Sequence, residues 1–421
     1  MSGPAGVLAW RCAVCGTTVD IAAAHAFTCP RATPGDRHHV LHPMTAESVP
    51  APVDDPNPFI AYGPRMAWWA FAAANGMTEP ARVALASEVA AGFAVTPLGR
   101  HEFDLAMNGD SPATAVWVKD ETGNVGGSHK SRHLAGILLH LRAAEALGVA
   151  PERSGRAPLA IASCGNAAIA AATLAQRVDW PLEVYVPDWA SPGVMALLES
   201  LGASINVCER REGDPPGDPA VLRFRDAVDA GALPFSVQGP ENGMCLDGGR
   251  TLGWELADAV GTAGGPARLD RMVVQVGGGA LATCVGWAVG PSVRLDTVQA
   301  DGCAPLARAW WRAKDAGMAA AEIPHRWSHL MTAWERPESL ADGILDDETY
   351  DWLGAFEVMT ASGGQPLVAP EEAIVRAAEI GASSGIPVSA TGAAALAGLL
   401  VREGKPAAGE QVAVIFSGVT R

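Results

Sequence analysis

Along most of the chain, short apolar runs alternate with stretches in which apolar residues recur every three to four positions. The short runs predict β-strands, and the longer periodic stretches predict amphipathic helices. Strands are predicted at residues 115–120, 159–165, 182–187, 271–279, 294–301 and 411–419. Helices are predicted at residues 67–76, 79–93, 134–148, 166–176 and 367–385.

Strands that alternate with helices of this length are typical of parallel βαβ units, so the pattern predicts an α/β fold. Ligands of open parallel sheets bind beyond the carboxyl ends of the strands. Four loops in which a strand gives way to a helix carry polar or glycine-rich sequences. We therefore look for chemistry in those loops.

Composition narrows the class of protein further. Apolar residues make up 49% of the 421 positions and charged residues 18%, a balance that supports a large core and excludes a disordered chain. The net charge of -16 makes a broad grip on nucleic acid or an anionic membrane unfavourable. No apolar run is long enough to span a bilayer, and the first thirty residues lack a signal-peptide pattern. We expect a cytoplasmic protein with reduced cysteines.

The first 45 residues form a separate predicted module, followed by a proline-rich linker at residues 48–59. A Cys-x-x-Cys pair with a third cysteine further on resembles part of a zinc ribbon. The candidate ligands are Cys12, Cys15, Cys29 and His39, with His38 and His42 as alternatives to His39. The competing interpretation is three buried or free thiols without metal.

The first candidate loop, GNVGGSHKSRH, places Lys130 after a flexible turn at the start of a helix. Lys130 is either a solvated first-turn side chain or an amine held for covalent chemistry. In the second loop, ASCGNAA, residues 163–166 join a strand to a helix. They either cap that helix or offer N–H groups to a carboxylate.

The third loop, Gly277–Gly279, can turn sharply and expose N–H groups to a phosphate at a helix start. It also matches a dinucleotide fingerprint with Asp301 about twenty residues on, which keeps a nicotinamide-dependent oxidoreductase as an alternative. The fourth loop places Thr391 and Gly392 before a small-residue helix. Thr391 either caps that helix or bonds a ring nitrogen.

An amine, a carboxylate loop, a phosphate loop and a ring-nitrogen hydroxyl together match pyridoxal phosphate with an amino-acid substrate. The set resembles the fold type II pyridoxal-phosphate enzymes, the group of tryptophan synthase β, threonine synthase and serine–threonine dehydratase. For the cofactor, the resemblance implies Lys130 as the covalent attachment point, Asn166 beside the phenolic oxygen, Gly277, Gly278, Gly279, Ala280 and Leu281 at the phosphate, and Thr391 at the pyridine nitrogen. For the substrate carboxylate it implies Ser163, Cys164, Gly165 and Ala167.

The resemblance also implies an architecture. It predicts a large domain of residues 46–130 and 236–421, a small domain of residues 131–235, and the cofactor in the cleft between two open parallel sheets. The zinc-ribbon-like module precedes them, as in some threonine synthase-like relatives. Relatives are commonly homodimers, and we expect one here.

The predicted reaction is α,β-elimination from a β-hydroxy amino acid, giving a 2-oxo acid and ammonia. Lys130 would remove the Cα proton, and a neutral Thr391 favours elimination or β-replacement over transamination. His129, where relatives carry Phe or Val, or His133 would assist by protonating the departing hydroxyl. Threonine synthase chemistry is the alternative, but a phosphorylated substrate needs further cations, and only Arg132 and Arg250 lie near the motifs.

Overall fold

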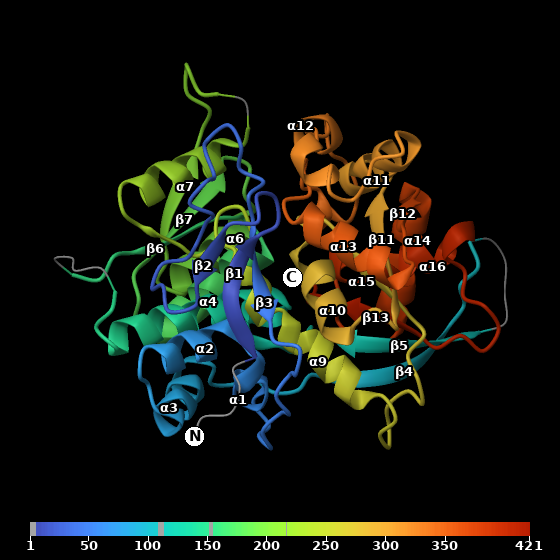
Figure 1. The fold of residues 1–421 in the computed structure, drawn as a ribbon. Coiled ribbons are helices and arrows are strands. Elements are labelled where there is room, and N and C mark those ends of the chain that lie inside the picture. The colour runs from blue at the N-terminus through green and yellow to red at the C-terminus, as the bar shows by residue number, and fades with distance from the viewer. Residues whose placement is uncertain (1–5, 108–112, 151–154, 216) are drawn as a thin grey trace.

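The structure, a computed structural model, describes residues 6–107, 113–150, 155–215 and 217–421. These residues form two sheets flanked by helices and a third, smaller sheet near the N-terminus. In Figure 1 the two larger sheets stand on either side of the molecule, and the C-terminal end lies between them. The predicted α/β class is confirmed.

The large sheet has the strand order β12-β11-β10-β13-β5-β4. Its strands are β4 (Leu98–Phe103), β5 (Thr114–Asp120), β10 (Arg271–Gln275), β11 (Arg294–Ala300), β12 (Pro366–Ala369) and β13 (Val412–Phe416). Every neighbouring pair is parallel except β4 with β5. The expected purely parallel sheet is therefore corrected at one edge, where an antiparallel strand is a common addition.

The helices of the large sheet cover both of its faces. They are α9 (Arg250–Ala259), α10 (Ala280–Val289), α11 (Pro305–Asp315), α13 (Trp352–Ser362), α14 (Glu371–Ser383) and α16 (Ala395–Leu400). Val412, Val414 and Phe416 of β13 join the core with α14 and α16, whereas Ala413 and Ile415 join the core with α9 to α13. Alternate residues of a strand point to opposite faces, so an all-apolar strand is what a sheet covered on both sides requires.

The small sheet is wholly parallel, with the order β8-β7-β6-β9. Its strands are β6 (Leu159–Ala162), β7 (Leu182–Pro187), β8 (Ser204–Cys208) and β9 (Leu233–Pro234). Helices α5 (Asn166–Arg177), α6 (Pro192–Ser200) and α7 (Pro219–Asp229) connect them. All four strands lie within residues 131–235, the segment expected to form the small domain.

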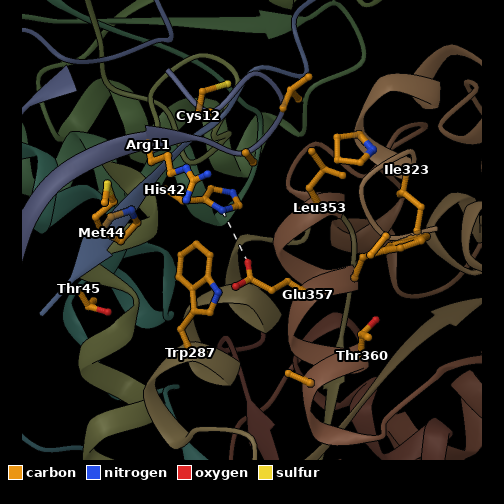
Figure 2. A pocket seen from close by; sticks show the side chains of 18 of the residues that line it. Arg11, Cys12, His42, Met44, Thr45, Trp287, Ile323, Leu353, Glu357 and Thr360 are labelled. Atoms are coloured by element: carbon orange, nitrogen blue, oxygen red, sulfur yellow. Dashed lines mark ion pairs between the residues drawn. The ribbon is translucent and has the colours of Figure 1, made fainter. Parts of the chain in front are cut away.

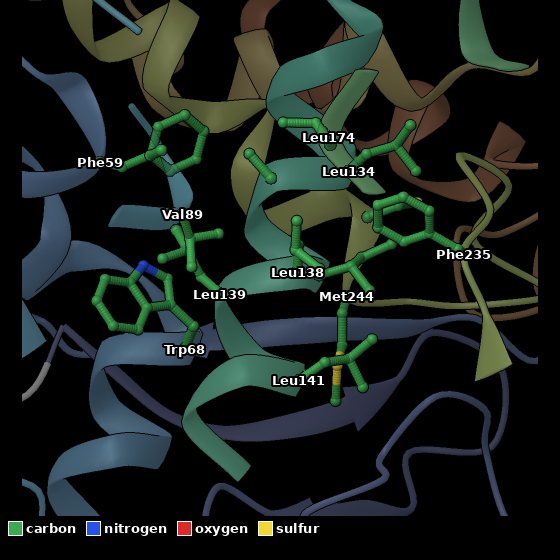
Figure 3. Packing of buried hydrophobic residues seen from close by; sticks show 14 of the residues in the cluster. Phe59, Trp68, Val89, Leu134, Leu138, Leu139, Leu141, Leu174, Phe235 and Met244 are labelled. Atoms are coloured by element: carbon green, nitrogen blue, oxygen red, sulfur yellow. The ribbon is translucent and has the colours of Figure 1, made fainter. Parts of the chain in front are cut away.

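Helix α4 (Lys130–Ala146) lies at the centre of the largest core, in contact with α2 (Ala67–Ala74), α3 (Glu79–Val89) and α5. Leu139 of α4 lies in this core beside Trp68 and Val89, and Leu138 lies on the side of Met244 (Figure 3). Thirteen of its 17 residues are buried, so the helix is held on nearly all sides. It begins four residues before the predicted start, and its first residue is Lys130.

The N-terminal module is a three-stranded antiparallel sheet, with the order β2-β1-β3. Its strands are β1 (Val7–Cys12), β2 (Thr18–Asp20) and β3 (Leu41–Thr45), and none of them was predicted. Trp10 and Leu41 are buried against the rest of the chain.

Short helices occur elsewhere along the described chain. They are α1 (Pro58–Ala61), η1 (Gly63–Arg65), η2 (Val125–Gly127), α8 (Cys245–Gly248), η3 (Ile323–Arg326), α12 (Trp327–Leu330), η4 (Asp342–Ile344), α15 (Ala390–Ala393) and η5 (Arg402–Gly404).

Across the described ranges, no helix has both the length and the apolar character that crossing a bilayer requires.

Candidate active site

The loop before Lys130 is fixed to the end of β13, the central strand of the large sheet. The N–H of His129 donates to the Ser417 carbonyl at 3.0 Å, and the N–H of Val419 donates to the Gly127 carbonyl at 2.9 Å. Ser128 and Gly418 form an isolated β-bridge between these two contacts. The turn that carries the predicted lysine therefore lies at the carboxyl edge of the sheet, where α/β proteins bind ligands.

Lys130 is half-buried at the first turn of α4. Its amine makes no hydrogen bond or ion pair with any residue that the structure describes. The buried helix fixes the Cα of Lys130, and the free amine keeps its bonding capacity. This combination suits an amine that must react with a carbonyl group.

The two histidines near Lys130 are anchored through their rings. Nδ1 of His129 lies 3.0 Å from the Ser417 carbonyl, and Nδ1 of His133 lies 2.8 Å from the Cys245 carbonyl. A carbonyl only accepts, so each Nδ1 must carry a hydrogen. Burial, followed by the charge of Lys130, lowers the pKa of His129 well below its ordinary value, and burial lowers the pKa of His133 to about 4. Both rings are neutral at pH 7, which disfavours the predicted proton donation by His129.

The predicted phosphate loop lies between β10 and α10. Gly279 is the N-cap of α10 and has a φ of 94°, a left-handed conformation that glycine adopts without strain. A Cβ at Gly277 would lie 2.4 Å from Oδ2 of Asp346 and 2.9 Å from Cα of Ile344. The loop is therefore shaped by the absence of side chains, and the first N–H groups of α10 follow it. Ala280 and Leu281 are the first two residues of that helix.

A carboxylate already lies against this loop. Asp346 accepts a hydrogen bond from the backbone of Gly278, and the N–H of Asp351 donates to the Gly278 carbonyl at 2.7 Å. Burial raises the pKa of Asp346 to about 6, and the charge of Lys130 limits the rise. The backbone of this loop thus already donates a hydrogen bond to a carboxylate of the same chain. A phosphate group has the same requirement for N–H donors, so the loop's chemistry fits the expected cofactor.

Asp351 is a second buried carboxylate beside the loop. Only 1% of the residue is exposed, and its Oδ2 accepts a 3.3 Å hydrogen bond from the N–H of Gly239. Its Oδ1 has no hydrogen-bond partner among the described residues. Burial raises the pKa of Asp351 to about 7, although the Gly239 hydrogen bond acts against the rise.

Asn166 begins α5 at the carboxyl end of β6, on the small sheet. Its Oδ1 accepts a hydrogen bond from the Arg421 guanidinium, which also donates to the Gly126 carbonyl at 2.5 Å. Arg421 therefore joins the Asn166 loop to the turn that precedes Lys130. The structure brings the predicted amine and the predicted carboxylate loop to the same region from two different sheets.

The rest of the second loop has the expected form. The N–H of Gly165 donates to Oγ of Ser163 at 3.3 Å, so Ser163 turns back toward its own loop. Cys164 is half-buried, and burial raises the pKa of its thiol. Ala167 is buried inside the first turn of α5. The protonated thiol of Cys164 leaves the backbone N–H groups of this loop as the donors for a carboxylate.

Thr391 lies within the short helix α15 and does not cap it. The cap is Ser389, whose side chain accepts a hydrogen bond from the N–H of Gly392 at 3.0 Å. The Thr391 hydroxyl donates to Oδ1 of Asp342 at 3.1 Å and accepts from the N–H of Gly343 at 3.0 Å. The structure therefore shows Thr391 bonded to residues 342–343.

Residues 342–351 are the part of the site that the sequence did not identify. They contact Thr391 at one end and the glycine loop at the other, so this one segment joins two predicted motifs. The only local signal was the acidic run at 346–348, which by itself is typical of a solvated surface. Only the tertiary fold places that run beside Gly277 and Gly278.

A network of buried charges fixes the first turn of α4. Arg132 bonds Glu121 at 2.8 and 2.9 Å and Glu255 at 2.6 and 3.1 Å, and Lys119 pairs with Glu255 at 2.6 Å. All four side chains are at most 1% exposed. Burial acts to raise the pKa of Glu121, but the adjacent Arg132 charge outweighs it and lowers the pKa.

This network removes Arg132 from the possible phosphate-binding residues. Arg250 is also 3% exposed and pairs with Asp247 at 2.5 Å. Neither of the two cations considered for a phosphorylated substrate is therefore free to bind one. Arg132 instead positions Lys130, which lies two residues before it on the same helix.

The structure also brings together the four predicted metal ligands. Ligand atoms of Cys12, Cys15, Cys29 and His39 all lie within 4.8 Å of one another. Nδ1 of His39 is 3.5 Å from Sγ of Cys12, and its Nε2 is 3.1 Å from Oδ2 of Asp36. A carboxylate on the second ring nitrogen is the usual way to orient a ligating histidine.

The alternative histidines lie outside this cluster. Nδ1 of His38 is 3.2 Å from the indole nitrogen of Trp352, and the His42 ring packs against Trp287.

Burial raises the pKa of Cys12 to about 12. For Cys15, burial acts in the same direction, but hydrogen bonds with Thr17 outweigh it and lower the pKa to about 6.

Comparison with known proteins agrees with this geometry. Residues 90–418 match the sequence family described as "Pyridoxal-phosphate dependent enzyme". No curated protein matches the chain. The sequence of the glycine loop left both pyridoxal phosphate and a nicotinamide dinucleotide open. The family match favours pyridoxal phosphate.

Similar solved structures share the fold at low sequence identity. Maize serine racemase is 19% identical with a TM-score of 0.60, covering 81% of this chain and 92% of that chain. The T.th. threonine deaminase is 20% identical with a TM-score of 0.60, covering 81% of this chain and 97% of that chain. L-serine ammonia-lyase from Rhizomucor miehei is 16% identical with a TM-score of 0.56, covering 77% of this chain and 94% of that chain.

The family match spans both sheets and every candidate catalytic loop, and it leaves the N-terminal cysteine module outside. Together with Lys130 and an oxyanion-binding glycine loop, it shows that the chain belongs to the family of pyridoxal-phosphate dependent enzymes.

Proposed function

We propose that the protein is a lyase that eliminates the β-substituent of a β-hydroxy or β-substituted amino acid, giving a 2-oxo acid and ammonia. The observation that carries this proposal is the state of the nearby cations. Arg132 and Arg250 are both buried and paired with carboxylates, and the Arg421 guanidinium bonds Asn166 and the Gly126 carbonyl, so each of these cations is already engaged. A small unphosphorylated substrate suits this site better than a phosphorylated one.

In this proposal the second and third loops share the binding of the cofactor and the substrate. Gly277–Gly279 and the first turn of α10 would hold the cofactor phosphate through N–H groups, and the Asn166 amide would bond the phenolic oxygen. Loop 163–167 holds the substrate carboxylate. When bound, pyridoxal phosphate withdraws electrons from the bonds at the substrate Cα.

Lys130 has two tasks in turn. Its amine would hold the cofactor, and with substrate bound the same nitrogen would take up the Cα proton. As an ammonium group it would then give this proton to the departing hydroxyl, which leaves as water, and addition of water at Cα would release ammonia and the 2-oxo acid. Arg132 and its two carboxylates keep α4, and therefore this nitrogen, in place. His129 is neutral and bonded to Ser417, so we assign it the positioning of the Lys130 turn.

Substrate tests distinguish elimination from replacement. The enzyme is incubated with serine, threonine, phenylserine and O-phosphohomoserine, and oxo acid, ammonia and phosphate are measured. We expect oxo acid and ammonia from at least one hydroxy amino acid, lost in Lys130→Ala and retained in the exposed control Lys405→Ala. Phosphate release with threonine formation, and no oxo acid, would favour the threonine synthase alternative.

We also propose that the N-terminal cluster binds a structural zinc ion. A tetrahedral site with metal–sulfur bonds of about 2.3 Å separates its sulfurs by about 3.8 Å, and Cys15 and Cys29 are 3.7 Å apart. Near-stoichiometric zinc should be lost in Cys29→Ser together with thermal stability, because binding is coupled to folding at such sites. The matched control is Cys208→Ser, a buried cysteine outside the cluster. Full stability without zinc would favour free thiols.

Three further expectations complete the proposal. We propose a cytoplasmic homodimer in which residues 131–235 act as the small domain and residues 46–130 and 236–421 as the large one. Native mass measurement tests the dimer. Limited proteolysis of the cofactor-loaded protein tests the domain division.

A further inference from the structure

One cavity lies away from the proposed catalytic residues. It has a volume of about 740 Å³, is open to solvent, and is lined by β1 and β3 of the N-terminal module, by α10 and α13, and by η3 (Figure 2). Lys130, Asn166, Thr391 and the glycine loop do not line it. Its size is in the range of pockets that hold small organic ligands.

Two basic side chains lie on the module side of this cavity. Arg11 of β1 and His42 of β3 are directly paired across the two antiparallel strands, so their side chains share one face. The Arg11 guanidinium makes no hydrogen bond or ion pair with any described residue. Nε2 of His42 is buried without a hydrogen-bond partner in the same part of the chain.

A carboxylate lies on the opposite side. Oε2 of Glu357, on α13, is 3.9 Å from Nδ1 of His42, and 61% of the Glu357 side chain is exposed. Burial lowers the pKa of His42 to about 4, so this ring is neutral at pH 7 and does not neutralise Glu357. Arg250 also lines the cavity but is paired with Asp247, and Glu357 also has a side-chain hydrogen bond with Trp287. The cation and the anion of the lining that have no charged partner are therefore Arg11 and Glu357.

Between the charges the wall is apolar. The Trp287 ring packs edge-on against His42 with centroids 4.8 Å apart, and Leu353, Phe356 and Met44 extend the surface. Figure 2 shows Trp287 and Glu357 facing His42 from the side opposite Arg11. A ligand that matches this lining needs a negative group, a positive group and an apolar body.

We propose that this cavity is a binding site for a free α-amino acid with an apolar side chain. The ligand carboxylate bonds Arg11, since a guanidinium matches a carboxylate with two parallel hydrogen bonds. The ligand ammonium bonds Glu357, and the side chain lies on Trp287 and Phe356. This site is separate from the catalytic one and goes beyond the proposed reaction.

The test uses the full-length, cofactor-loaded protein and L-phenylalanine as the probe. Titration calorimetry should show saturable binding that weakens about tenfold or more in Glu357→Gln, because one charge-assisted contact is lost. Arg11→Gln should weaken it similarly. The matched control Glu372→Gln, on the exposed side of α14, should bind as the unchanged protein does.

Ligand analogues and the cofactor spectrum make the test specific. N-acetyl-phenylalanine lacks the ammonium and phenethylamine lacks the carboxylate, so each should bind about tenfold more weakly than phenylalanine. Binding at this cavity should leave the visible absorbance of the cofactor unchanged. A failure of the proposed reaction would leave these results unaffected, because no catalytic residue lines the cavity.

Three results would overturn the proposal. They are the absence of binding at about 10 mM phenylalanine, well above the millimolar range of weak ligands, equal affinity in Glu357→Gln, and equal affinity of the N-acetyl analogue. A change in cofactor absorbance that tracks binding would place the ligand in the catalytic site instead. Arg11 neighbours Cys12, so if Arg11→Gln loses its fold, Glu357→Gln alone decides.

Discussion

Two groups of charged side chains lie near Lys130, and they differ in how their charges are balanced. Around Arg132, two cations and two carboxylates neutralise one another through short hydrogen bonds. Beside the glycine loop, Asp346 and Asp351 have only backbone N–H partners, and burial raises the pKa of both. In the first group every charge has an oppositely charged partner, whereas the two carboxylates of the second group have none. We call the first group saturated and the second unsaturated.

The difference separates scaffold from reaction site. A saturated charge network holds a helix in one place, whereas removing one partner from it is costly. Carboxylates left with raised pKa values next to an amine are typical of places where a ligand or a reaction supplies the missing partner. We infer that the Arg132 group positions Lys130 and that the Asp346 group lies where the cofactor phosphate binds.

The largest expected effect comes from breaking the saturated group. Arg132→Met leaves Glu121 and Glu255 buried without their main partner, so we expect a loss of about 3 to 5 kcal/mol in the free energy of unfolding. Denaturant unfolding measures it. Arg268→Met is the matched control, since Arg268 pairs with Asp270 at the surface and its loss should leave the free energy of unfolding nearly unchanged. A comparably small loss in Arg132→Met would contradict the scaffold role.

The second prediction tests the raised pKa of Asp351 by measuring stability as a function of pH. An acid whose pKa is higher in the folded state binds more protons folded than unfolded between its two pKa values. With an ordinary value of 3.8 and a folded pKa of about 7, Asp351 makes stability fall as pH rises between these values. Relative to Asp351→Asn, the unchanged protein should lose on the order of 4 kcal/mol between about pH 4 and pH 8.

This comparison isolates Asp351 because the buried histidines contribute equally to both proteins. Their pKa values are lowered, so they reduce stability as pH falls through about 6.5 to 4 in either protein. Unfolding in denaturant at several pH values gives the difference directly. Two parallel stability curves would show that Asp351 has no raised pKa.

The smallest expected effect concerns cofactor affinity. Asp346 is ionised above its pKa of about 6 and then repels a phosphate at the same loop. Asp346→Asn should bind pyridoxal phosphate at least about tenfold more tightly at pH 8, with a smaller gain near pH 5.5. Fluorescence titration of the cofactor-free protein measures it. The neighbouring Asp347→Asn serves as control. An unchanged or weaker affinity in Asp346→Asn would show that the cofactor phosphate does not bind at this loop.

The sequence predicted the parts of the fold that carry strong local patterns. The strands at 115–120, 271–279 and 411–419 were found because buried parallel strands are continuously apolar. Strands β1 to β3 were missed because they are short and only partly buried, which weakens alternation. Strand β4 was missed for a similar reason, since LGRHEF is largely polar.

Site residues were predictable wherever a single loop contains both the turn and the reactive or glycine-rich sequence. The glycine loop and the turn before Lys130 have sequences that only a tight turn explains. The environments of those loops were not predictable, because Asp346 lies about 70 residues from Gly277 along the chain and meets it only through folding. His129 illustrates the same limit, since its neutral state depends on burial and on a carbonyl at Ser417.

The central claim is that Lys130 holds the cofactor, and the chain makes this unusually easy to test. It contains four lysines, of which Lys119 is buried in an ion pair and Lys314 and Lys405 are exposed. The protein loaded with pyridoxal phosphate is reduced with borohydride, digested and mapped by mass spectrometry. We predict the added cofactor mass on the peptide of Lys130 alone, and its absence in Lys130→Ala. A mass on Lys314 or Lys405, or none at all, would contradict the account.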